Sequence, residues 1–139
     1  MTMPSKSGFF TTGSKGFIEQ EENAMKYIVA IIQPHRLEEV KQALEAVDVN
    51  LMTVTNVLGQ GRQKGHTEIY RGAKEVGGLL RKVRLDIAVN EAFVEPTIAA
   101  IQKGAKTDGG KVGDGKIFIL DLADCVRISS GERGGIAIG

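Results

Sequence analysis

Two stretches of alternating apolar and polar residues enclose a long glycine-rich segment, and this arrangement limits the folds open to the chain. Residues 51–58 and 80–89 both have the two-residue period of a half-buried strand. Between them, roughly residues 60–79 are rich in glycine and charged residues and have no apolar period. Two strands separated in this way pair as a hairpin, and a hairpin loop of this length is uncommon and usually functional. The pattern therefore predicts a hairpin whose loop has a role in function.

Two further strands and two helices are predicted around this hairpin. Residues 26–32 form a short, β-branched apolar run, and residues 116–122 form another strand-like run. Apolar residues recur at helical spacing in two places: Leu37, Val40, Leu44 and Val47, and then Val94, Ile98, Ile101 and Ala105. The order βαββαβ predicts an α+β, ferredoxin-like sandwich with both helices on one sheet face. Because the strands are apolar on both sides, we expect self-association to cover the other face.

The two ends of the chain differ from the middle. Residues 1–24 show no sustained period, so we expect a flexible N-terminal arm or an added expression sequence there. One domain is predicted over residues 25–133, followed by a flexible tail over 134–139. Residues 125–129 have the pattern of a short last strand, which would make Cys125 a buried, inert thiol.

Composition excludes several classes of function. Eighteen Lys and Arg nearly balance seventeen Asp and Glu, and the net charge of +1 gives no bulk attraction to nucleic acid or an anionic membrane. A single cysteine cannot form an internal disulfide or a zinc site. No apolar run approaches the roughly 20 residues that span a bilayer. We therefore expect a cytoplasmic protein that does not bind nucleic acid and meets a membrane only through a partner.

Two glycine-rich stretches with basic residues, 59–72 and 107–116, point to a local anion site. Glycines let backbone N–H groups approach an anion, and neighbouring Lys and Arg neutralise its charge. A nucleotide or phosphorylated metabolite is the expected ligand.

These two stretches resemble the PII signal-transduction family, through GRQKGHTE at residues 61–68, YRG at 70–72 and KVGDGKIF at 111–118. The resemblance implies a compact, non-catalytic homotrimer with adenine nucleotide, ATP or ADP, in three clefts between subunits. It also implies that 2-oxoglutarate joins Mg²⁺ and ATP there. The loop over residues 61–79, the family's T-loop, would then change conformation and control an ammonium transporter or a metabolic enzyme.

The resemblance also implies roles for individual residues. The implied nucleotide contacts are Thr53, Gly59, Gly61, Arg62, Gln63, Gly113, Asp114, Gly115, Lys116 and Arg127. The implied 2-oxoglutarate contacts are Gln63, Lys64, Gly65, Lys82 and Gly113, and Gln63 would also help to hold Mg²⁺. An amide oxygen beside phosphate oxygens suits Mg²⁺, and a lysine suits a carboxylate. From the residues alone, Lys82 is more typical of a solvated lysine at a strand edge. Asp114 fits equally well a turn residue whose carboxylate accepts hydrogen bonds from its own backbone.

Departures from the family pattern leave two alternatives open. Glu75 and Ala73 occupy the positions of the family's modified tyrosine and serine, and Ser129 replaces a second phosphate-binding arginine. Gln33 replaces a basic residue, and Asp108 and Gly109 form an insertion. These changes motivate a PII-like ADP or AMP sensor whose second ligand, for example bicarbonate, controls a different transporter. The other alternative is a slow ATPase, against which the missing catalytic base and Walker motif argue.

Overall fold

The computed structural model describes residues 24–61, 69–70, 73–76 and 78–139. The main strands are β1 (Met25–Ile32), β2 (Thr53–Gly59), β5 (Leu79–Asn90) and β6 (Gly115–Leu122). The helices are α2 (Leu37–Glu45), α3 (Val94–Ala105) and the short C-terminal α4 (Gly135–Ile138). Two small strands, β3 (Ile69–Tyr70) and β4 (Ala73–Val76), lie within the long loop, and 3₁₀ turns cover Pro34–Arg36, Glu91–Phe93 and Val112–Asp114.

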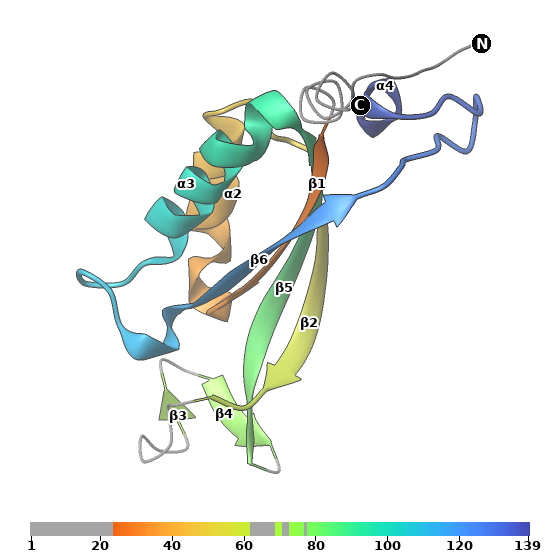
Figure 1. Cartoon of the computed structure of the whole chain (residues 1–139). Helices are drawn as coiled ribbons and strands as arrows, with labels where there is room; N and C mark the ends of the chain where they lie inside the picture. The colour runs from red at the N-terminus through yellow and green to blue at the C-terminus, as the bar shows by residue number, and fades with distance from the viewer. Residues whose placement is uncertain (1–23, 62–68, 71–72, 77) are drawn as a thin grey trace, which may run out of the picture.

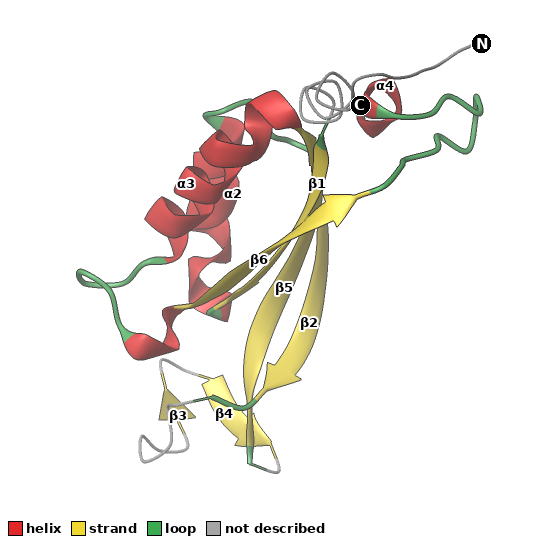
Figure 2. Ribbon diagram, in the orientation of Figure 1, coloured by secondary structure: helices red, strands yellow, loops and turns green. Residues whose placement is uncertain are grey.

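The four main strands form one antiparallel sheet in the order β2-β5-β1-β6. The predicted hairpin is confirmed, because β2 pairs with β5 in a register that ends with Gly59 opposite Leu80. Helices α2 and α3 lie side by side across one face of the sheet (Figures 1 and 2). The predicted α+β, ferredoxin-like βαββαβ fold is therefore confirmed. The pair β3–β4 inside the long loop, which extends the sheet through β4 and β5, was not predicted.

The core lies between the sheet and the two helices. Alternate residues of β1 and β5, such as Ile28 and Leu85, are fully buried there and meet Val40, Leu44 and Ile101 of the helices. This packing explains the helical period seen in the sequence, because the periodic residues are those that face the sheet. The polar faces of both helices point to solvent.

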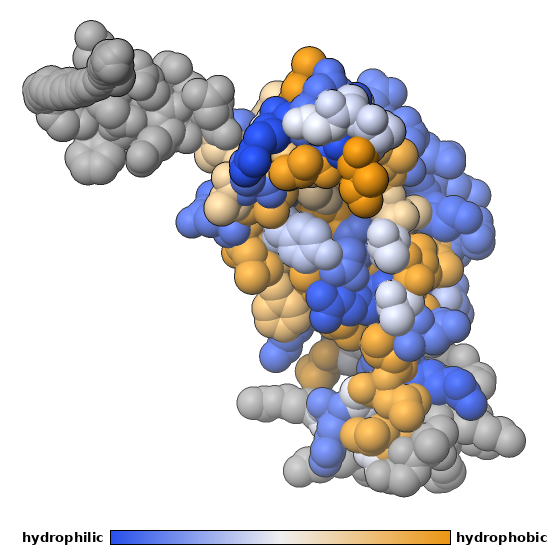
Figure 3. All heavy atoms as spheres, turned by 90° about the vertical axis from the view of Figure 1, so that its right-hand side faces the viewer, coloured by the Kyte–Doolittle hydropathy of each residue, from blue (hydrophilic) through white to orange (hydrophobic). Residues whose placement is uncertain are grey.

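The sheet face away from the helices carries exposed apolar side chains. Phe118 and Leu120 on β6 are each 49% exposed, and β6 lies at a sheet edge without a strand partner on its outer side among the described residues. Figure 3, which views the molecule from the side away from the helices, shows apolar side chains interspersed with polar ones over this face. Apolar surface at a free strand edge is normally covered in a working protein.

The C-terminal segment corrects one prediction. Residues 125–129 do not form a strand, since the pairing there is a single bridge between Val126 and Arg133. Cys125 is only partly buried. Where a flexible tail was expected, the structure has helix α4, which buries Ala137 and accepts a hydrogen bond from Asn90 Nδ2 at the Gly135 carbonyl, 3.1 Å. The segment folds through polar contacts between near neighbours, which leave no apolar period in the sequence.

Candidate functional site

Residues 59–61, at the start of the first glycine-rich stretch, and residues 112–116 of the second meet at one end of the sheet and line a cleft of about 340 Å³. The register explains why: Ile32 of β1 pairs with both Val83 and Gly115, and Gly59 pairs with Leu80, so the ends of β1 and β2 meet the starts of β5 and β6. The cleft is lined by Ile31, Gly59, Gln60, Gly61, Lys82, Val112, Gly113, Gly115, Lys116 and Phe118. Backbone-rich glycine segments with two lysines suit an anionic ligand that carries an apolar or aromatic part.

The two lysines of the cleft lie in different environments. Lys116 is exposed at the start of β6. Lys82 on β5 is half-buried, and its burial lowers the pKa of its ammonium group, while the nearby Asp114 carboxylate acts in the opposite direction. A partly desolvated ammonium forms stronger interactions with an anion than one in bulk water. Lys82 therefore lies in the same cleft as Lys116, and its binding of an anion stays a prediction.

Hydrogen bonds of Asp114 and Gln33 hold the loop before β6 in place. The Asp114 carboxylate accepts hydrogen bonds from the Thr107 backbone N–H (3.0 Å), the Thr107 hydroxyl (2.6 Å) and the Lys111 backbone N–H (2.8 Å). Gln33, which is 1% exposed, donates from Nε2 to the Gly113 carbonyl at 2.6 Å. Asp114 thus braces the loop whose glycines line the cleft. Gln33 was noted in the sequence only as a missing charge, and its part in fixing Gly113 was not foreseen.

The inserted Asp108 and Gly109 form a tight turn on the outer side of this loop. Both have positive φ, +41° and +84°, and Gly110 N–H donates to the Thr107 carbonyl at 2.7 Å. The Asp108 carboxylate is exposed, lies 3.9 Å from Lys111 Nζ, and does not line the cleft. The insertion therefore lengthens the loop without placing a carboxylate against the expected phosphates.

Two implied ligand residues lie away from the cleft. Thr53 is at the start of β2, opposite Asp86, six residues from Gly59 at the cleft. Arg127 lies beyond the far end of β6, where it forms a short ion pair with Glu132 and donates to the Ile136 carbonyl at 2.8 Å. The implied contacts Arg62, Gln63, Lys64 and Gly65 lie outside the described residues. The structure thus brings together Gly59, Gly61, Lys82, Gly113, Gly115 and Lys116, with Asp114 behind them.

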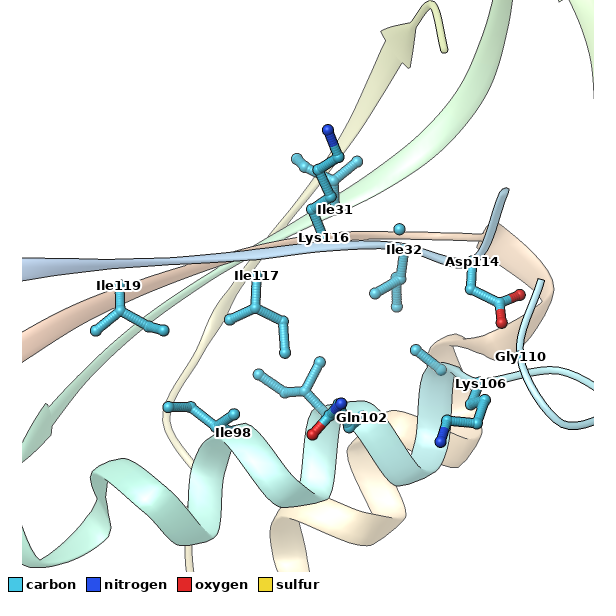
Figure 4. A pocket seen from close by; sticks show the side chains of 13 residues that line it. Ile31, Ile32, Ile98, Gln102, Lys106, Gly110, Asp114, Lys116, Ile117 and Ile119 are labelled. Atoms are coloured by element: carbon cyan, nitrogen blue, oxygen red, sulfur yellow. The ribbon is translucent and has the colours of Figure 1, made fainter. Parts of the chain in front are cut away.

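A second concavity of about 400 Å³ lies on the other face of β6, between that strand and α3. We call it the isoleucine groove, after Ile32, Ile98, Ile101, Ile117 and Ile119 in its lining. Figure 4 shows Ile117 and Ile119 of the strand facing the helix that carries Ile98 and Gln102, with Lys106 and Asp114 at one end of the groove. The sequence analysis treated Ile98 and Ile101 as core residues and so missed this groove. A signal was present, since residues 117–120 are all apolar, which is unusual for an edge strand.

The described residues offer little for metal binding by protein side chains. They contain no group of three His, Cys, Asp or Glu that could hold a metal ion. In the part of the chain that the structure describes, no helix is long and apolar enough to cross a membrane.

Comparisons with known proteins give the family. The model of the family "Nitrogen regulatory protein P-II" matches residues 25–132. The chain is 50% identical to nitrogen regulatory protein GlnK1 of Methanosarcina mazei, over 83% of this chain and 98% of that protein. It is 51% identical to nitrogen regulatory protein P-II of Rhodospirillum rubrum, over 82% of this chain and all of that protein. The crystal structure of Arabidopsis thaliana PII bound to citrate superimposes with a TM-score of 0.66 at 34% identity, covering 83% of this chain and 92% of that one. The chain therefore belongs to the nitrogen regulatory protein P-II family of signal-transduction regulators.

Proposed function

We propose that this protein binds an adenine nucleotide in the cleft between its two glycine-rich stretches. The observation that carries the proposal is the convergence of Gly59, Gly61, Gly113 and Gly115 with Lys82 and Lys116 around about 340 Å³. Backbone N–H groups and ammonium groups complement phosphates, while Ile31 and Phe118 supply apolar surface for the rest of the ligand. ATP and ADP are the expected ligands.

The complete site is proposed to form between subunits of a homotrimer. Two expected contacts, Thr53 and Arg127, lie away from the cleft within one chain. A neighbouring copy supplies them if its β2 and its C-terminal segment approach the cleft. The exposed apolar residues Phe118 and Leu120 on the open sheet face support such an association, because burying them removes apolar surface from water.

Mg²⁺ and a second, smaller anion complete the proposed ligand set. Mg²⁺ prefers octahedral oxygen ligands and usually takes several of them from phosphates and water, so the absence of an acidic cluster among the described residues is compatible with it. The Gln63 amide would add one protein oxygen. The second anion is 2-oxoglutarate, held by Lys82 through its far carboxylate and by Gln63, Lys64, Gly65 and Gly113.

The protein is proposed to act by switching its long loop rather than by catalysis. Gly59 and Gly61 both line the cleft and begin the loop, so a ligand there touches the loop at its root. A ligand shifts a loop equilibrium only as far as it binds one loop state better than the other. The switched loop would then engage an ammonium transporter or an enzyme of nitrogen metabolism.

A second candidate keeps the nucleotide and changes the second ligand. The buried Gln33 amide is engaged by the Gly113 carbonyl and brings no charge to the cleft. The Arabidopsis structure is described as bound to citrate, another carboxylate. In this alternative, ADP or AMP binds together with another small anion such as bicarbonate, and the target is a different transporter.

Calorimetric titration separates the two candidates. ATP, ADP and AMP are titrated into the purified protein alone and then with Mg²⁺ and 2-oxoglutarate. If 2-oxoglutarate binds only when Mg-ATP is present, the first candidate holds. If nucleotide binds and 2-oxoglutarate does not, the second candidate holds, and citrate and bicarbonate are titrated next. If no nucleotide binds, both candidates fail.

A further inference from the structure

Large apolar side chains lie in the N-terminal segment, which comprises residues 1–24. Three of the chain's five phenylalanines, Phe9, Phe10 and Phe17, are in this segment, and Ile18 follows directly. The family model begins only at residue 25, so the segment lies outside the part of the chain that the family model covers. Between Ile18 and strand β1 the segment is polar, with three glutamates among residues 19–22. Apolar side chains in such a polar stretch gain free energy when they find an apolar surface within reach.

A pocket of about 210 Å³, which we call the end pocket, lies at the end of the sheet where β1 begins. Its walls come from the loop after α2, the end of β5, the 3₁₀ turn before α3 and helix α4, and they include Val49, Leu51, Val89, Phe93 and Ile138. The rim is open to solvent, since Leu51 is 65% exposed and Phe93 is 38% exposed. A dry apolar cavity of about 150 Å³ holds a benzene ring, so the end pocket has room for one aromatic side chain.

Hydrogen bonds hold two walls of the end pocket in place. After α2, the Val49 backbone N–H donates to the Leu44 carbonyl at 3.0 Å, which fixes the loop at that wall. At another wall, Asn90 Nδ2 donates to the Gly135 carbonyl at 3.1 Å and ties α4 to β5. A pocket that is already formed binds a side chain more tightly than one that must first be ordered. The end pocket is therefore preorganised for an occupant.

The N-terminal segment enters the fold beside this pocket. Met25, the first residue of β1, pairs with Asn90, which lines the end pocket. Antiparallel partners have Cα atoms about 5 Å apart. Phe17 lies eight residues before Met25, and eight extended residues span up to about 26 Å, so its side chain reaches the pocket with chain to spare. The two phenylalanines farther from β1 reach it as well, but closing a longer loop costs more entropy.

We propose that the N-terminal segment folds back on its own chain and places Phe17 in the end pocket, against Leu51 and Phe93. Two aromatic rings in contact gain from offset or edge-to-face packing beyond their burial. The segment's own phenylalanine is the favoured occupant because a short tether gives it an effective concentration on the order of millimolar at the pocket. The polar residues 19–24 would remain in water as the tether. The pocket lies beside the start of β1 and α4, at the opposite end of the sheet from β3 and β4 (Figure 1).

The docked segment would act as a strap over helix α4. Ile138 of this helix lines the end pocket, so a ring in the pocket would pack on α4 and hold it against β5. With only four residues, α4 is too short to be stable without such packing. Arg127 donates to the Ile136 carbonyl of the same helix at 2.8 Å. The strap would therefore link the N-terminal segment to the C-terminal segment that carries this arginine.

Cysteine pairs in the full-length protein test the position of Phe17. In a Cys125→Ser background, Phe17→Cys is combined with Leu51→Cys at the end pocket or, as a control, with Ile119→Cys in the isoleucine groove, where Ile119 is 49% exposed. After mild oxidation we expect the Leu51 pair to give a monomer band that migrates faster before reduction, with the link identified by peptide mass spectrometry. No link at Leu51, a Leu51 link between two copies, or equal linking at both positions would overturn the inference.

Hydrogen exchange at α4 gives an independent measurement. Phe17→Asp should speed exchange of the α4 backbone amides about tenfold or more, because it removes a buried ring that packs on the helix. Phe10→Asp is the matched control in the same segment and should exchange like the unchanged protein. If Phe17→Asp leaves the exchange unchanged, the inference fails, whereas nucleotide titration still decides the proposed function. If the unchanged protein binds no nucleotide but forms the Leu51 link, the proposed function fails and the inference stands.

Discussion

The two lysines of the cleft lie in different surroundings. Lys116 is exposed and directly follows the glycine loop, a position that suits contact with the phosphate groups of a nucleotide. Lys82 is half-buried, and burial lowers the pKa of its ammonium group. A partly desolvated cation interacts more strongly with an anion than one in bulk water, so we propose that Lys82 holds the second anion and Lys116 the phosphates.

Replacing Lys116 with alanine should weaken every phosphate-bearing ligand. A charge-assisted hydrogen bond contributes roughly 1.5–3 kcal/mol, so nucleotide affinity should fall about tenfold to a hundredfold. Calorimetric titration of ATP measures the change. The control is Lys111→Ala, which removes a lysine of the same loop that pairs with Asp108 and does not line the cleft. Equal losses for both variants would show that Lys116 contributes only general charge.

The second anion should bind in a pH-dependent manner through Lys82. Because burial lowers its pKa, Lys82 loses its proton at a lower pH than an ordinary lysine. The ligand carboxylates stay ionised, so 2-oxoglutarate affinity should be constant well below the pKa of Lys82 and should fall as the pH rises through it. Lys82→Arg keeps its charge at every accessible pH, so its profile should be flat in this range. Parallel profiles for the two proteins, measured by titration with Mg-ATP present, would exclude this role.

Among the elements, the junction between the glycine loop and β6 is the least tolerant of change. Gly115 has φ of +124°, and a Cβ built there would lie 1.9 Å from the Ile31 carbonyl oxygen. This close approach aligns β6 with β1 from its first residue, since Gly115 pairs with Ile32. The cleft therefore depends on a glycine for its shape as well as for its backbone donors.

Gly115→Ala should destabilise the protein more than Gly109→Ala does. Gly109 has φ of +84° and open space where a Cβ would be, so alanine there should cost roughly 1–2 kcal/mol from the left-handed backbone alone. At Gly115 the added carbon must also displace the β1–β6 junction. Urea unfolding at one fixed chain concentration gives the comparison, since association changes apparent stability. Equal costs at both positions would show that the junction relaxes easily.

How much of these elements the sequence predicts depends on how their residues are held. The strands and α2 and α3 were predicted close to their observed ends, because apolar residues such as Leu44 and Ile101 repeat toward one core. The turn within residues 123–134 was not predicted. It depends on ion pairs such as that between Arg133 and Asp124, and such pairs leave no periodic pattern in the sequence. Similarly, the Gln33–Gly113 bond joins residues 80 positions apart and has no local signal. The isoleucine groove was missed because a periodic pattern shows which residues form an apolar face, but does not show whether another part of the chain covers that face.

At the scale of the whole molecule, one chain holds only some of the proposed nucleotide contacts in its cleft. One chain brings together both glycine stretches and two lysines, but it keeps Arg127 beyond the opposite end of β6, paired with Glu132. A neighbouring copy in the proposed trimer would be the simplest source of this arginine at the cleft.

Mixing two defective variants tests shared sites in the assembled protein. Lys116→Ala chains lack the phosphate lysine, and Arg127→Ala chains lack the arginine, so each variant alone should bind nucleotide weakly at every site. Suppose that each site takes Lys116 from one copy and Arg127 from its neighbour. After random exchange of the two variants, a site is restored when the copy that supplies Lys116 is an Arg127→Ala chain and the neighbour that supplies Arg127 is a Lys116→Ala chain. The chance is one half times one half, so roughly one site in four should regain the original affinity.

Calorimetric titration of ATP after subunit exchange in mild urea counts these sites, and unmixed variants treated identically serve as controls. No tight sites in the exchanged sample, with exchange itself verified by native mass spectrometry, would show that both residues act within one copy.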